Sequence, residues 1–118
     1  MKMLIIDAAN KEINLMIINN DITYSITHEN SKINYDRLTV LIYNFLNSKN
    51  LKLGDINKIY VNRGPGSFAG IRNSLSAVKA FNLAKKIEYY CYSYVDFKDE
   101  IEIKPANIPK LCDKFNVK

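Results

Sequence analysis

The sequence has little histidine, cysteine or arginine, and each shortage narrows what the chain can do. A single histidine, His28, and two cysteines, Cys91 and Cys112, give no spacing typical of a zinc site or of a Cys-x-x-Cys redox pair. Only three of the 17 basic residues are arginine, and the lysines are scattered along the chain. The net charge of +5 is therefore a weak indication of direct nucleic acid binding. We expect no metal site and free thiols.

Long apolar runs are also absent. The N-terminus carries one lysine and a short apolar run that ends at Asp7, which is too short for a signal peptide or a membrane span. We therefore expect a cytoplasmic protein with no membrane contact. The 118 residues are enough for one domain, which at this length buries roughly two-thirds of the surface of its unfolded chain.

Hydrophobic patterning predicts five strands and two main helices. The strands are expected over residues 2–7, 13–18, 22–28, 58–61 and 88–95, and the helices over 36–48 and 71–86. The order βββαβαβ predicts an α/β fold with a mixed five-stranded sheet and helices packed on it. We assign residues 1–95 to this domain. We treat residues 96–118 as a short C-terminal tail, with the second subdomain absent.

Three of the four glycines lie within seven residues, between a predicted strand and a predicted helix. Backbone N–H groups can converge on an anion at such a turn. Ser67 is a candidate N-cap, and Arg72 lies in the first helical turn, where a cation opposes the helix dipole and indicates an anionic partner. We predict a weak nucleotide or anion loop at these positions: Gly64, Gly66, Ser67, Gly70 and Arg72. Such turns are also common in α/β domains that bind nothing, and the spacing fits neither Walker A nor Gly-x-Gly-x-x-Gly.

The glycine turn carries a family resemblance. Residues 64–72 read Gly-Pro-Gly-Ser-Phe-Ala-Gly-Ile-Arg, and this resembles the signature of the TsaB (YeaZ) family, with Ala69 in place of the usual Thr. The first strand up to Asp7 is also similar, with Ala8-Ala9 in place of Thr-Ser. Residues 35–38 resemble the family's His-Ser-Glu-Arg-Leu helix start, with Asn34 at the His position. The resemblance, over residues 1–95, implies a ribonuclease H-like subdomain of the actin/Hsp70-like ATPase superfamily.

The resemblance implies a role in threonylcarbamoyladenosine modification of tRNA, at the adenosine next to the anticodon. TsaB-like proteins are non-catalytic scaffolds and activators. They pair with a TsaD-type catalytic subunit, and a TsaE-type ATPase joins that pair. We therefore expect a non-catalytic subunit that contacts tRNA indirectly, with a homodimer as a second assembly. We expect no resident cofactor, with ATP or ADP only at the interface of the complex.

The family forms its partner interface with the two helices of this subdomain. In this sequence those helices are the predicted segments 36–48 and 71–86. Our interface candidates are residues off the main apolar face of the first helix and small or aromatic residues of the second: Val40, Tyr43, Ser74, Ala77 and Phe81.

The residues argue against independent catalysis. Two-metal nucleases of this fold class need three or four carboxylates, and only Asp7 ends a predicted central strand, because the next strand leads into Asn62-Arg63. Actin-fold phosphotransferases follow the first-strand Asp with Gly and Ser or Thr, which Ala8 and Ala9 do not supply. We expect no catalytic residues and a structural role for Asp7.

Two alternatives remain open at this point. One is a small nucleotide-binding domain that uses the Gly64–Gly70 loop. The other is a decayed family member, which the residues at positions 8, 9, 34 and 69 and the short length favour.

Overall fold

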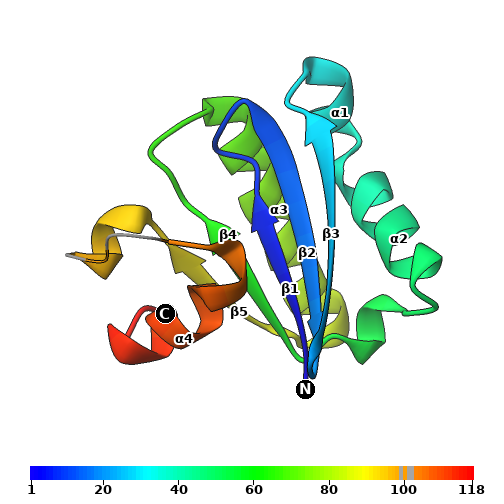
Figure 1. The fold of residues 1–118 in the computed structure, drawn as a ribbon. Helices are drawn as coiled ribbons and strands as arrows, with labels where there is room; N and C mark the ends of the chain where they lie inside the picture. Colours follow the sequence, from blue (N-terminus) through cyan, green and yellow to red (C-terminus); the bar gives the residue numbers. More distant parts are fainter. Residues whose placement is uncertain (99, 101–102) are drawn as a thin grey trace.

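The computed structural model describes residues 1–98, 100 and 103–118. Its strands form one mixed sheet in the order β3-β2-β1-β4-β5 (Figure 1). β1 to β3 are an antiparallel meander, β4 runs parallel to β1, and β5 runs parallel to β4. The strand bounds are β1 Lys2–Asp7, β2 Glu12–Asn19, β3 Ile22–Glu29, β4 Lys58–Asn62 and β5 Glu88–Tyr92. The predicted mixed α/β sheet is confirmed.

The helices differ from the predicted ranges at their ends. The helix predicted over 36–48 is α2 (Leu38–Ser48), which starts two residues later because the backbone of Arg37 lies outside the helical region with φ −107°. A short helix that was not predicted, α1 (Lys32–Asp36), precedes it. α3 spans Phe68–Lys85 and starts earlier than predicted, since Ser67 caps it through a hydrogen bond from the Gly70 amide to the Ser67 hydroxyl, 3.2 Å. The predicted N-cap is confirmed.

The last predicted strand is too long. β5 ends at Tyr92 because Ser93 and Asp96 form a capping box that begins the 3-10 helix η2 (Tyr94–Phe97). The Ser93 amide donates to Asp96 Oδ2 over 2.8 Å, and the Ser93 hydroxyl accepts from the Val95 amide over 3.4 Å. The turn therefore carries Tyr94 away from the sheet.

The two faces of the sheet are covered by different parts of the chain. Residues alternate along each strand, so that Leu4 and Ile6 of β1 face the helices α2 and α3, and Ile5 faces the other way. Figure 1 shows α2 and α3 on one side of the sheet. Their apolar residues build the larger core with β1, β2 and β4.

The opposite face is covered by the end of the chain. α4 (Ile108–Lys114) follows the 3-10 helix η3 (Pro105–Asn107), and a further 3-10 helix, η1 (Leu53–Asp55), precedes β4. Phe97, Ile108 and Leu111 pack with Ile5 and Tyr60 in the second core. The segment that we predicted as a tail thus contributes buried side chains to the sheet. No helix in the described part of the chain is both long and apolar enough to cross a membrane.

Candidate functional site

The carboxyl ends of the parallel strands meet at one edge of the sheet. β1 ends at Asp7, β4 at Asn62 and β5 at Tyr92, and the glycine turn starts beside them. In open α/β sheets this edge is where ligands bind, next to the point where the strand order reverses. The pairing therefore brings together residues that are 55 and more positions apart in the sequence.

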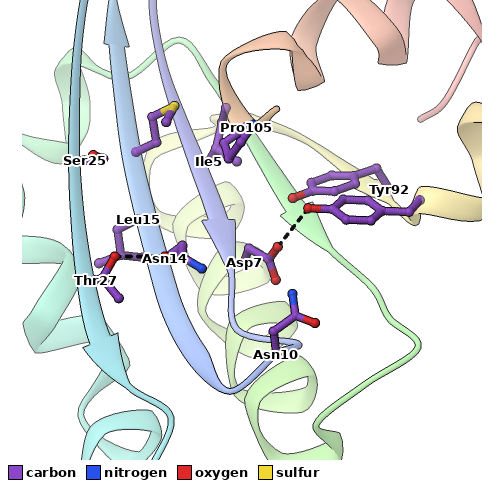
Figure 2. A pocket seen from close by; sticks show the side chains of 11 residues that line it. Ile5, Asp7, Asn10, Asn14, Leu15, Ser25, Thr27, Tyr92 and Pro105 are labelled. Atoms are coloured by element: carbon purple, nitrogen blue, oxygen red, sulfur yellow. Dashed lines mark hydrogen bonds between the residues drawn. The ribbon is translucent and has the colours of Figure 1, made fainter. Parts of the chain in front are cut away.

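Asp7 is the centre of a buried hydrogen-bond network. Its Oδ1 accepts from the Ala9 amide over 3.1 Å and from Asn62 Nδ2 over 3.2 Å. Its Oδ2 has a long contact of 3.5 Å with the Tyr94 hydroxyl, drawn as a dashed line in Figure 2. Asn62 Oδ1 in turn accepts from the Gly64 amide over 2.8 Å. The network ties the end of β1 to the glycine turn, which agrees with the structural role that we expected for Asp7.

The glycines allow the turn to lie directly on the β1–β2 connection. A Cβ atom at Gly70 would overlap the carbonyl oxygen of Ala8, and one at Gly66 would overlap that of Ala9. Gly64 has φ +102°, which favours glycine. The close approach accounts for the glycines at these positions by packing alone.

Three amides of the turn have acceptors inside the protein. The Gly64 amide donates to Asn62, the Gly70 amide to the Ser67 hydroxyl, and the Ser67 amide to the Ala9 carbonyl over 2.7 Å. Arg72 is exposed and its guanidinium lies over the Phe68 ring, 5.6 Å from the centroid. The structure thus brings the glycines and Ser67 together and places Arg72 on the helix surface. The anion loop stays a prediction.

A cavity of about 210 Å³ adjoins Asp7 (Figure 2). β1, β2 and β3 line one side of it, and Tyr92, Tyr94 and Pro105 line the other. Burial, together with the nearby Asp7 carboxylate, raises the pKa of both tyrosine hydroxyls above the ordinary value. Both phenols are therefore neutral at pH 7. Asp7 could be singled out from the sequence, but the position of the two tyrosines beside it could not be predicted.

The described residues contain no group of three or more His, Cys, Asp or Glu side chains placed to hold a metal ion. At the end of β4, where a second carboxylate would be needed beside Asp7, the side chain is the Asn62 amide. Of the residues that end β1, β4 and β5, Asp7 is therefore the one that carries a carboxylate.

The structure corrects the predicted partner surface. Val40 and Tyr43 on α2 are 45% and 42% exposed, but Ser74, Ala77 and Phe81 on α3 are buried inside the domain. The Ser74 hydroxyl donates to the Gly70 carbonyl within its own helix, and the Phe81 ring packs edge-on against Tyr43. Ser74 and Phe81 thus pack within their own chain, whereas Ala77, though 7% exposed, lines the groove between α2 and α3.

Sequence reasoning missed an uncharged helix surface. α2 has no charged residue over its whole length, although six of its positions are exposed: Thr39, Val40, Tyr43, Asn44, Asn47 and Ser48. A groove of about 220 Å³ separates the start of α2 from α3, and Thr39, Ser76 and Ala80 line it. The absence of charged residues from positions 38–48 could have predicted this surface.

Comparison with known proteins identifies the family. Residues 28–96 match the family model described as "TsaD: tRNA N6-adenosine threonylcarbamoyltransferase", and no curated protein matches at a significant level. The structure of YeaZ from Pseudomonas aeruginosa is similar with a TM-score of 0.71 and 20% identity, over 78% of this chain and 43% of YeaZ. The chain thus spans less than half of the length of that relative.

RuvC from Thermus thermophilus has a similar fold at lower scores. Its complex with a Holliday junction gives a TM-score of 0.57 with 14% identity, over 83% of this chain and 68% of RuvC. A second RuvC structure gives 0.56 with 12% identity, over 98% and 80%. Both agree with the predicted ribonuclease H-like architecture. The family match covers more than half of the chain and includes the glycine turn that predicted a TsaB (YeaZ) relative, and the chain therefore belongs to the TsaD family.

Proposed function

We propose that this chain is a TsaB-type, non-catalytic subunit in the threonylcarbamoyladenosine modification of tRNA. It binds a TsaD-type catalytic subunit through the exposed surface of α2 and α3 and contacts tRNA indirectly. Membership of the TsaD family and the YeaZ-like fold support the pathway. The observation that carries partner binding is the uncharged exposed surface of α2.

The chemistry of this surface fits a protein partner. Interface cores are depleted in charged residues and enriched in aromatic ones, and α2 presents Val40 and Tyr43 among neutral side chains. At the adjoining groove, the amide nitrogen Nδ2 of Asn73 is buried without a hydrogen-bond partner among the described residues. A partner that inserts an acceptor into the groove would satisfy this donor. The revised interface therefore comprises Thr39, Val40, Tyr43, Ser76 and Ala80.

The non-catalytic role rests on the edge of the sheet. Asp7 accepts two hydrogen bonds at Oδ1 and has a 3.5 Å contact with the Tyr94 hydroxyl at Oδ2, and the amides of Gly64, Ser67 and Gly70 donate within the domain. Hydrogen bonds of this kind stabilise the fold, and they support a structural role for these groups over a catalytic one. We infer that the catalytic residues belong to the TsaD-type partner, with a TsaE-type ATPase as a further component of a cytoplasmic complex. ATP or ADP then binds at the interface of that complex.

The test is reconstitution of the modification. The TsaD-type subunit of the same organism is supplied with threonylcarbamoyl-adenylate and substrate tRNA, with and without this chain, and the modified nucleoside is quantified by mass spectrometry. We expect modification only when both proteins are present, and none with this chain alone. Equal modification without this chain would contradict the proposed activator role, and modification by this chain alone would contradict the non-catalytic one.

A further inference from the structure

The cavity beside Asp7 lies outside the proposed partner surface. Its volume of about 210 Å³ exceeds the roughly 150 Å³ cavity that holds a benzene molecule, and it is smaller than the roughly 300–1,000 Å³ of drug-sized sites. A compound somewhat larger than benzene would therefore fit. The pocket lies on the sheet face away from α2 and α3, since Asn14 and Met16 of β2 line it.

The charge in this pocket is unbalanced. Asp7 is 7% exposed, and no lysine, arginine or histidine lines the cavity among the residues that the structure describes. Buried carboxylates are rarely found without a cationic partner. Asp7 Oδ1 accepts two hydrogen bonds, of 3.1 and 3.2 Å, but Oδ2 has the 3.5 Å contact with the Tyr94 hydroxyl alone among the described residues. The carboxylate thus keeps acceptor capacity on the side of the cavity.

The other polar groups around the carboxylate are neutral. Figure 2 shows Asn10, Asn14 and Tyr92 around the same space as Asp7. Asn14 Oδ1 accepts from the Thr27 hydroxyl over 2.9 Å, which fixes the orientation of the Asn14 amide. Beside the carboxylate, the hydroxyl oxygens of Tyr92 and Tyr94 can accept further N–H donors of an ammonium group.

The rest of the lining is apolar. Ile5, Met16 and Pro105 line the cavity, and the Tyr92 ring beside them stacks on Tyr94 with centroids 6.2 Å apart. Such a wall suits methylene groups. We propose that the cavity binds a small aliphatic primary amine, with its ammonium group on Asp7 and its alkyl chain against Ile5 and Met16.

The test compares probes of equal size and different charge. Binding of n-butylammonium, n-butanol and butyrate to the full chain is measured by amide chemical shifts in NMR titrations. We expect saturable binding of n-butylammonium that is about tenfold or more tighter than that of n-butanol, and no binding of butyrate. Equal affinity for n-butylammonium and n-butanol, or no saturable shift with n-butylammonium, would overturn the proposal.

Variants locate the site. Asp7→Asn keeps the shape of the side chain and should remove the preference for n-butylammonium over n-butanol, whereas Asp21→Asn in an exposed turn should keep it. Ser25→Phe fills the cavity from β3 without changing the Asp7 bonds, so that it should abolish binding of both probes even if Asp7→Asn does not fold. An unchanged preference in Asp7→Asn, or unchanged binding in Ser25→Phe, would contradict the assignment.

Discussion

Asn62 at the end of β4 donates a hydrogen bond from Nδ2 to Oδ1 of Asp7 at the end of β1, over 3.2 Å. The same Asn62 side chain accepts from the Gly64 amide through its Oδ1, over 2.8 Å. One buried amide therefore satisfies a carboxylate on one strand and positions the glycine turn that follows its own strand. The edge of the sheet is built around this pair.

Asn62→Ala should destabilise the fold by about 2 kcal/mol, because it removes one donor from the buried Asp7 carboxylate and leaves the Gly64 amide without its acceptor. Urea unfolding followed by circular dichroism measures the change. Asn47→Ala, at an exposed position of α2, is the matched control and should change the free energy of unfolding by about 0.5 kcal/mol or less. Equal effects of the two variants would show that the network does not stabilise the edge.

Gly70→Ala should cost roughly 2 kcal/mol or more, because the added methyl group overlaps the backbone carbonyl of Ala8. Gly54→Ala is the matched control, since a Cβ at Gly54 meets no atom within 4 Å, and it should change the stability by about 0.5 kcal/mol. Thermal and urea unfolding of both variants test this difference. A tolerated Gly70→Ala would contradict the close packing of the turn on the β1–β2 connection.

Millimolar ATP or ADP should leave the melting temperature of the isolated chain unchanged, because three amides of the glycine turn donate inside the domain. The measurement is differential scanning fluorimetry over a nucleotide titration. A rise in melting temperature that is lost in Gly66→Val would instead support the nucleotide-binding alternative.

Alkaline pH should weaken the fold through Cys112. Burial raises the pKa of its thiol from the ordinary 9.0 to about 12. Between pH 9 and 12 the folded state keeps a proton that the unfolded state loses, so the free energy of unfolding falls as the pH rises, by up to about 1.4 kcal/mol per pH unit. Denaturant unfolding between pH 8 and 10 should show this slope. Cys112→Ala should reduce the slope, and an unchanged slope would assign it to other groups.

Ala80→Arg should weaken binding of the TsaD-type subunit by about tenfold or more, because a long charged side chain would fill the groove between α2 and α3. Ala106→Arg introduces the same side chain at an exposed position of η3, outside this groove, and should leave binding unchanged. Titration calorimetry with the partner compares the two. A similar affinity of both variants and the native chain would remove α3 from the interface.

The strands could be predicted because apolar and polar residues alternate within each of these short segments. Lys2–Asp7 matches its predicted range, β2 is one residue longer than predicted at each end, and β3 is one residue longer at its C-terminal end. The break at Arg37 and the end of β5 could not be predicted in this way. The break at Arg37 depends on one backbone torsion angle. The end of β5 depends on a capping box between Ser93, which lies inside the predicted strand, and Asp96.

The candidate site was predicted in its residues more than in its contacts. Asp7 and the glycine turn could be recognised as motifs in the sequence. They lie next to each other only because β1 pairs in parallel with β4. For Ser74, Ala77 and Phe81, the sequence pattern did not show which surface they contact. Small and aromatic residues at helical spacing fit a partner or a neighbouring element equally well, and only the packing of α3 shows that they are buried within this chain.

The most direct test of the account is complex formation between this chain and the TsaD-type protein of the same organism. Size-exclusion chromatography with light scattering would measure the mass of the mixture at tens of micromolar, a concentration well above the roughly micromolar dissociation constant of a weak specific complex. The account predicts a stable complex whose mass equals the sum of its subunits. Separate elution of the two proteins, with this chain as a monomer or homodimer, would contradict it.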